Sequence, residues 1–247
     1  MENEETDAVT TDENGLPLAH TQQFGAGELD GEFGASDFKL PYLSLVNKTG
    51  QLSNDFQPGS FLYNKEVVVS DGKEPFLVTA LGMKKDYVED IEFDSEIMPR
   101  SFARLADAEG EGYSLDYEAD KRVKERAMIL TLVPVPEDYG TFFAPDHLTE
   151  FLAEQADRLF NGKPRMSWAL AMWIVQSSAY NAVAKPLATA KMGGHLRGGL
   201  HHGPWVLQSE LKNYRSNSWY APRIRSGGRH SPEFIQWIEQ TVLPKAR

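Results

Sequence analysis

The residue types with the clearest chemical potential are aromatic and basic side chains that alternate near the end of the chain. The stretch from Lys212 to Arg225 reads KNYRSNSWYAPRIR and holds no acid. Lysine and arginine neutralise phosphates, and flat rings stack on unpaired bases for roughly 1–3 kcal/mol each. Every base has a π-face, so such a site tolerates any base sequence. The combination predicts a site for single-stranded nucleic acid.

The expected contacts extend beyond this stretch, because basic residues continue on both sides of it. On an extended strand Arg215 and Trp219 would share a face, as would Arg223 and Arg225. The expected contacts are Lys185, Lys191, Arg197, Trp205, Lys212, Tyr214, Arg215, Trp219, Tyr220, Arg223, Arg225 and Arg229.

Not every tryptophan is a stacking candidate, although all five lie in the final 80 residues. Trp168 and Trp173 stand in an apolar run and are expected in the core. Trp237 lies on an amphipathic helix, where packing is the better interpretation. The candidates at positions 205, 214, 219 and 220 stay open between exposed and buried.

The charge pattern separates the two ends of the chain. The formal net charge is -11, yet residues 1–38 hold ten acids and no Lys or Arg. Residues 161–247 hold twelve Lys or Arg against three acids, which leaves +9. Such asymmetry is typical of an acidic tail and a polyanion-binding face. The alternative is that the basic face docks onto the acidic middle of the same chain.

Other chemistry finds less support. His195, His201 and His202 lie among glycines and could bind zinc, but no zinc-motif spacing is present and no carboxylate stands near in sequence. We therefore expect no metal and assign these histidines to phosphate contacts. No phosphate-loop or G-x-S-x-G motif exists, and the chain has no cysteine. We expect no cofactor and no catalysis.

The elements that must position these residues can be placed from apolar patterning. Residues 1–36 are acidic and poor in large apolar residues, which predicts disorder. Strands are expected over 60–69, 75–83, 85–93, 127–135, 205–211 and 217–224, with a hairpin turn at 70–73. Residues 168–175 fit a strand or a buried helix, and 193–203 a flexible connection. Helices are expected over 147–160, over 177–191 with a kink at Pro186, and after Ser231.

These elements predict an α+β fold, either an OB-like β-barrel or a curled antiparallel sheet with two or three peripheral helices. The expected domains are a disordered acidic tail, 1–36, and a single OB-like nucleic-acid-binding domain, 37–247, with a long acidic insertion near 94–126. That insertion is expected to be a mobile excursion.

The layout resembles a group of phage-encoded single-stranded DNA-binding proteins. The resemblance covers about residues 38–240 and is carried by LPYLSLV at 40–46, PGSF at 58–61, KDYVE at 85–89, SAYNAVAK at 178–185, WVL at 205–207 and SWYAP at 218–222. It implies an OB-like barrel that coats single-stranded DNA during replication or recombination, without catalysis. By position, Lys185, Trp219 and Tyr220 would be binding residues. Familiar members carry their acidic tail at the C-terminus, whereas here the acids lie at the N-terminus.

Two other functions stay open. The chain could be an acidic protein-interaction module or inhibitor, a DNA mimic that binds a basic host protein. It could also be a metal-dependent nuclease. No apolar run approaches the roughly 20 residues that span a bilayer, and no signal peptide is recognisable. We therefore expect a cytoplasmic protein, in the host cytoplasm if phage-encoded, whose partners are single-stranded DNA and, through the tail, replication or recombination proteins.

Deletion of residues 1–36 tests the role of the acidic tail. If the tail competes with DNA for the basic face, its removal should tighten binding to an oligonucleotide at low salt. Unchanged affinity in a titration would contradict the competition.

Overall fold

The computed structural model describes residues 40–91, 97–144, 167–194 and 196–245, all within the unit Leu40–Arg247. The expected disordered tail and the expected helix over 147–160 lie outside the described residues. Among described residues, no helix combines the length and apolarity needed to cross a membrane.

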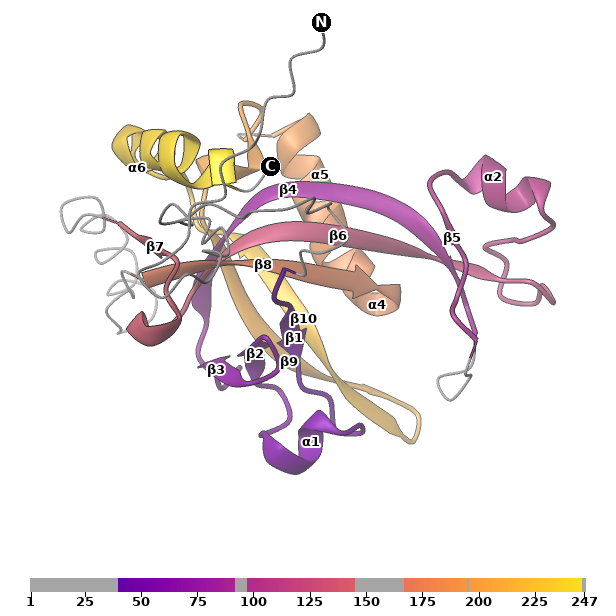
Figure 1. Ribbon diagram of the computed structural model, residues 1–247. Helices are drawn as coiled ribbons and strands as arrows, with labels where there is room; N and C mark the ends of the chain where they lie inside the picture. Colours follow the sequence, from indigo (N-terminus) through magenta and orange to yellow (C-terminus); the bar gives the residue numbers. More distant parts are fainter. Residues whose placement is uncertain (1–39, 92–96, 145–166, 195, 246–247) are drawn as a thin grey trace, which may run out of the picture. The chain divides into compact units, whose positions relative to one another are not determined.

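The described unit is built on antiparallel strands (Figure 1). A seven-stranded sheet runs β10-β9-β4-β6-β8-β7, with β5 also paired to β4, and a three-stranded sheet runs β1-β2-β3. The strands are β1 Leu43–Leu45, β2 Phe61–Tyr63, β3 Val67–Ser70, β4 Phe76–Glu89, β5 Ser101–Phe102, β6 Val123–Pro134, β7 Phe142–Phe143, β8 Ser167–Gln176, β9 Trp205–Tyr214 and β10 Asn217–Ser226.

Short helices surround these sheets. The α-helices are α1 Leu52–Asp55, α2 Leu105–Gly110, α4 Ser177–Ala179, α5 Lys185–Met192 and α6 Pro232–Trp237. The 3-10 helices are η1 Glu137–Tyr139, η3 Leu200–His202 and η5 Leu243–Lys245, and the π-helices are η2 Tyr180–Ala184 and η4 Ile238–Val242. Ser231 accepts a hydrogen bond from the Phe234 amide at 3.2 Å, as expected for the N-cap of the last helix.

The large sheet is curled, and the segment around β1 lies near both of its far strands. The Met172 amide of β8 donates to the Pro41 carbonyl at 2.8 Å, and the Tyr220 amide of β10 donates to the Asn47 side chain at 3.2 Å. Strand pairing in the described part of the chain does not close a barrel. The α+β class is confirmed, and the curled sheet describes it better than a barrel.

Two apolar cores lie on opposite faces of the large sheet, as the alternation of β9 shows. Trp205 and Leu207 belong to the core that η2 and α5 cover, whereas Val206 packs in the core that α6 covers. Successive strand residues point to opposite faces, so a strand buried on both sides reads as a continuous apolar run. This explains why 168–175, which could have been a buried helix, forms β8.

Strand β4 differs from the expectation of two separate strands. It runs unbroken for 14 residues from Phe76 to Glu89, with a shift of register between Ala80 and Gly82 where it pairs with β6. A bulge of this kind bends a strand without ending its pairing. The apparent break in the sequence pattern is therefore a bulge within one strand.

The expected strand over 60–69 is divided into β2 and β3 by a turn, and the hairpin expected after it was wrong. Asn64 and Lys65 take positive φ angles of 53° and 62° and turn the chain between β2 and β3. The Asp71 carboxylate then accepts from the Lys73 amide at 2.9 Å, but the strands on either side of this turn belong to different sheets. The Asp-Gly signal thus predicted a turn correctly, but the strands before and after this turn do not pair with each other.

The expected mobile insertion is also corrected, because its described residues pack around a small core of their own. Phe102, Ala108, Tyr113 and Val123 are all less than 9% exposed at the far end of β4 and β6. The Tyr113 hydroxyl donates to Glu89 of β4 at 2.9 Å. Residues 97–122 thus form a folded extension at the end of β4 and β6 (Figure 1).

The helical segment over 177–192 contains an irregularity next to Pro186, as expected, in the form of the π-helix η2. The five residues of η2 immediately precede Lys185 and Pro186 at the start of α5. Proline cannot donate to an earlier carbonyl, and a π-turn is one way to accommodate that loss without ending the helix. Val183, Ala184 and Leu187 remain in the core throughout.

A buried histidine joins β4 to the segment before α6. The Nε2 atom of His230 lies 2.9 Å from the Thr79 hydroxyl, and the residue is 4% exposed. Burial first, and then the nearby His201 and His202, lower the pKa of His230 to about 3. The folded protein therefore holds this imidazole neutral at pH values where a free histidine is protonated.

This difference predicts acid sensitivity. The unfolded chain takes up a proton at His230 below about pH 6.5, whereas the folded chain does so only near pH 3. The contribution of neutral His230 to the free energy of unfolding is therefore fully present above about pH 6.5, and it is lost as the pH falls from there toward 3. Between pH 7 and pH 5 the free energy of unfolding should fall by about 2 kcal/mol more in the wild type than in His230→Gln. Urea unfolding at both pH values measures this, and equal losses would refute it.

Candidate nucleic-acid interface

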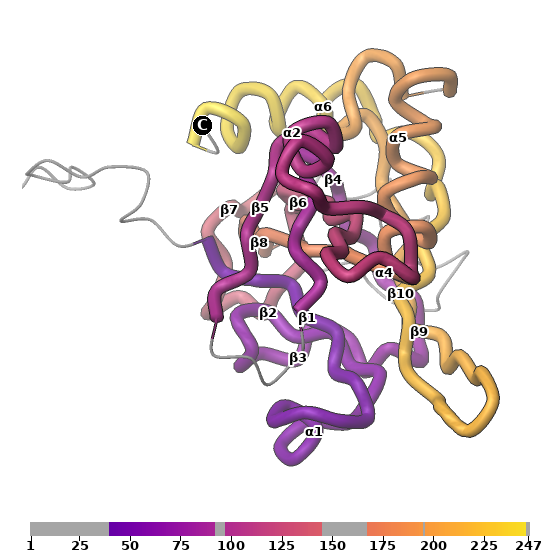
Figure 2. The backbone as a smooth tube through the Cα atoms, turned by 90° about the vertical axis from the view of Figure 1, so that its right-hand side faces the viewer, coloured from indigo at the N-terminus to yellow at the C-terminus, as the bar shows by residue number. Residues whose placement is uncertain are grey.

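The expected binding stretch forms an antiparallel hairpin. Strands β9 and β10 pair over ten residue pairs, from Trp205 with Ser226 to Tyr214 with Asn217. Arg215 begins the turn with a φ of 53°. The tip of the hairpin projects away from the rest of the described unit in two views at right angles (Figures 1 and 2).

One face of this hairpin gathers aromatic and basic side chains. Trp219 lies directly opposite Lys212, and directly opposed residues of an antiparallel pair share a face. By strand alternation Tyr214, Arg223 and Arg225 fall on that same face. We call these five residues the hairpin face. Arg223 and Arg225 share a face as expected; Arg215 lies in the turn, so Lys212 rather than Arg215 accompanies Trp219.

Exposure divides the expected aromatic contacts. Tyr214 is 61% exposed, and Trp219 and Tyr220 are half-buried. Trp205 is only 2% exposed, which corrects its expected stacking role: it starts β9 inside the core, and no base can reach its ring. Trp168 and Trp173 are buried as expected.

A cleft borders the hairpin where β10 approaches β1 and the end of β8. Its volume is about 730 Å³, which is within the usual range for small-ligand sites. Trp219 and Tyr220 line it from the hairpin, and Tyr42, Asn47 and Lys65 line it from the other side. The cleft therefore offers aromatic walls and hydrogen-bonding groups beside the hairpin face.

The basic residues of this region are exposed, and most lack an acidic partner. Lys212 pairs with Glu210 at 2.9 Å, and the Lys191 ammonium donates to the Arg197 carbonyl at 2.9 Å. Within the described residues, the other expected cations without an ion pair are Lys185, Arg197, Arg215, Arg223 and Arg229. From 178 to 229 eight Lys or Arg face one acid, a net +7.

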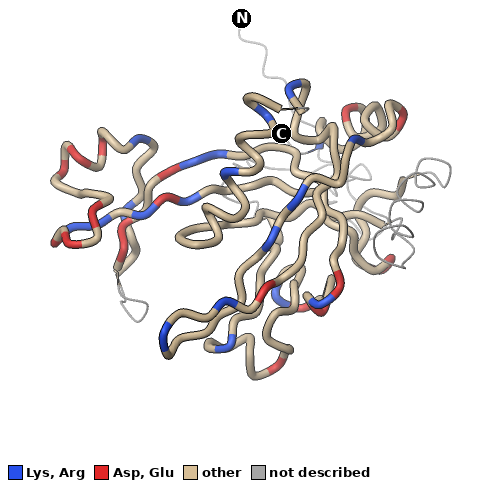
Figure 3. Tube along the Cα trace, turned by 180° about the vertical axis from the view of Figure 1, so that it is seen from behind, with Lys and Arg blue, Asp and Glu red and all other residues tan. Residues whose placement is uncertain are grey.

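The side of the unit that carries the hairpin shows this excess directly. Seen from behind, Lys and Arg positions follow the hairpin with one acidic segment among them, while Asp and Glu gather around α2 and the loop after it (Figure 3). The expected cations on α5 and in the loops at 197 and 229 belong to the same stretch of sequence, residues 178–229. The hairpin thus carries four of the expected cations, Lys212, Arg215, Arg223 and Arg225, and the other four lie outside it.

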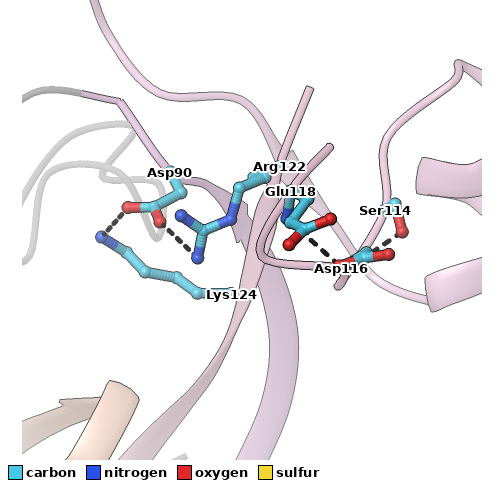
Figure 4. A network of polar contacts seen from close by, with 6 residues as sticks. All are labelled: Asp90, Ser114, Asp116, Glu118, Arg122 and Lys124. Carbon is cyan, nitrogen blue, oxygen red and sulfur yellow. Dashed lines mark hydrogen bonds and ion pairs between the residues drawn. The ribbon is translucent and has the colours of Figure 1, made fainter. Parts of the chain in front are cut away.

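Asp86 and Asp90, near the outer end of β4, are held by cations in or next to β6. The Arg126 guanidinium donates through two nitrogens to the Asp86 carboxylate, which keeps the pKa of Arg126 above its usual value. Asp90 pairs with Arg122 and Lys124, each at 3.1 Å (Figure 4). Residues 97–126 hold seven acids and six Lys or Arg, so their net charge is only -1.

A second cluster was missed by the sequence analysis. The Nε2 atoms of His201 and His202 lie 3.1 Å and 3.7 Å from the same Glu239 oxygen. The two imidazoles lower the pKa of Glu239, and burial lowers the pKa of His202. Glu239 follows 38 residues after His201, so no local spacing indicated the contact. His195 lies outside the described residues.

Comparison with known proteins gives no relative: no family model, no curated protein and no solved structure matches the chain.

Proposed function

We propose that this protein binds single-stranded DNA without sequence preference, and that the β9–β10 hairpin carries the binding. The observation that supports this most is the hairpin face, where Lys212, Arg223 and Arg225 stand beside Trp219 and Tyr214 on a projecting arm. Cations attract the phosphates over a distance set by salt, while rings stack on bases by contact.

The cations and the aromatic rings have separate roles in this proposal. Lys212, Arg223 and Arg225 lie along the strands and follow the sugar-phosphate backbone. Tyr214, at 61% exposure, and Trp219 present ring surface to successive bases. A base that leaves the stack at Trp219 can enter the adjacent cleft, where Asn47 and the cleft's other polar groups meet its edge. Stacking is tolerant of base identity, which accounts for binding without sequence preference.

The charge of the hairpin fits this proposal better than it fits an acidic interaction module. A DNA mimic must present unpaired carboxylates in an array. Asp86, Asp90, Glu111 and Glu125 are held by cations of their own segment, while five other acids between 107 and 120 have no ion pair among the described residues. The hairpin region, by contrast, leaves cations without acidic partners among the described residues. Unpaired charge is thus positive at the hairpin, whereas the acids without an ion pair among the described residues lie in other segments.

The wider role follows from the resemblance stated above. A sequence-tolerant binder of this kind would coat single strands during replication or recombination, in a phage, without catalysing a reaction. An OB-like relationship belongs to the same proposal, and the curled antiparallel sheet is its structural support.

Trp219 gives the proposal an optical test. Oligo-dT should quench the intrinsic fluorescence of the wild type, because Trp168, Trp173 and Trp205 are at most 3% exposed and Trp219 is the tryptophan on the hairpin face. In Trp219→Phe most of this quenching should disappear. In Trp219→Ala the affinity should fall by roughly 5- to 150-fold, the equivalent of one stacked base.

The matched control is Trp237→Phe, since Trp237 packs on Phe234 at 5.2 Å within the α6 core. That variant should keep both the quenching and the affinity. Undiminished quenching in Trp219→Phe would exclude the hairpin face as the stacking site.

Salt dependence tests the cations. Arg215→Gln together with Arg223→Gln should weaken binding for all sequences and reduce the slope of log affinity against log salt by about 1.4, or about 0.7 for each phosphate contact on a single strand. Titrations at several salt concentrations give that slope.

An equal loss of charge elsewhere is the control. Arg104 and Lys121 are exposed residues of the folded extension, residues 97–122. Changing both to glutamine should leave the slope nearly unaltered. If both double variants lowered the slope equally, the attraction would come from net charge alone.

A further inference from the structure

We propose that His201, His202 and Glu239 form a zinc site that joins η3 to η4. One potential ligand atom from each residue lies within 4.8 Å of the other two. Two imidazoles and a carboxylate are a donor set that zinc and related transition-metal ions favour. This inference does not depend on the proposed function.

The spacing of the donors suits a tetrahedral ion. Zinc binds nitrogen and oxygen at about 2.0–2.1 Å, which places neighbouring ligand atoms of a tetrahedron about 3.3 Å apart. The Glu239 oxygen is 3.1 Å from His201 Nε2 and 3.7 Å from His202 Nε2. Both separations lie within 0.4 Å of that value, and the ligand atoms of the two imidazoles lie within 4.8 Å of each other.

An ion pair alone accounts for only part of this arrangement. His201 is within hydrogen-bonding distance of Glu239, but His202 Nε2 at 3.7 Å is beyond it. The other ring nitrogen of His202 is buried and has no hydrogen-bond partner among the described residues. A metal ion would give His202 Nε2 the partner that the protein does not supply.

Two glycines leave room for the imidazoles in this orientation, because they have no Cβ atom. The rings of His201 and His202 pack edge to face with centroids 4.6 Å apart, although adjacent residues often point away from each other. A Cβ atom on Gly198 would overlap the His202 ring, and one on Gly199 would overlap the His201 ring. Leu196 and Leu200 are buried on either side of these glycines and fix the loop to the core.

The site is accessible from solvent. The side chains of His201 and His202 are 12% and 18% exposed, and that of Glu239 is 49% exposed. His201 also lines a second cleft, of about 520 Å³, together with Lys191 and Met83. Three protein ligands leave a fourth position for water or a small anion, as in zinc sites that are not purely structural. A bound ion would also tie the glycine-rich loop to the C-terminal helix.

Zinc binding by the full-length chain tests the proposal. Protein stripped with a chelator is titrated with Zn²⁺ in competition with a chromogenic chelator near pH 7.5. We expect the wild type to bind one equivalent at this site. Glu239→Gln removes a ligand and should weaken that equivalent by at least tenfold, since losing even an outer partner of a ligand costs roughly 10- to 100-fold.

The matched control is Glu233→Gln, which removes an exposed carboxylate from the preceding α6 helix. It should bind zinc like the wild type, and zinc should raise the unfolding temperature of both but not that of Glu239→Gln. Because Glu239 is half exposed, its glutamine variant should fold, and circular dichroism verifies this. Equal zinc affinity in the two variants, or no bound equivalent in the wild type, would overturn the proposal.

Discussion

Three residue pairs hold the β9–β10 hairpin to the rest of the sheet. Phe76, Leu77 and Val78 of β4 pair with Leu207, Val206 and Trp205 at the base of β9. Beyond Leu207, β9 pairs only with β10 among the described strands. The outer part of the hairpin therefore extends beyond the sheet, where Ser209 and Ser218 still contact Gly72 and Lys48, and the side to which the hairpin face points depends on the register that these pairs fix.

That register is strongly determined because the base of β9 is buried on both sides. Trp205 and Leu207 fill one core, and Val206 fills the other. A slip by one residue would exchange the two faces of the strand and expose this apolar surface to water. With the β9–β10 pairing unchanged, the same slip would turn Lys212 and Trp219 together to the opposite side of the sheet. Burial of Trp205 thus helps to fix which side of the sheet the hairpin face occupies, although the ring itself lies in the core.

Charge pairing differs between the outer ends of β4 and β6 and the hairpin. At the outer ends of β4 and β6, acids are neutralised locally through the Asp86–Arg126 pair and the two cations around Asp90. The hairpin and the loops beside it hold an excess of cations, and a projecting arm leaves these cations hydrated, where like charges repel only weakly. A polyanion can neutralise them at little cost in desolvation. The His201–Glu239 contact near the C-terminal helix is a separate polar junction between segments distant in sequence.

Elements with local signals could be predicted from the amino-acid order. Proline and serine set the start of α6, apolar runs set β6 and β9, and the acid-free stretch marked the hairpin as the candidate site. Which side chains meet could be read from the folded chain alone, because pairing and burial depend on residues far away in the sequence. Tertiary structure merged two expected strands into β4 through a bulge, removed Trp205 from the surface, placed Lys212 beside Trp219, and brought Glu239 to a histidine pair 38 residues earlier. Periodicity reports that a residue has a buried side, but not which distant segment covers it.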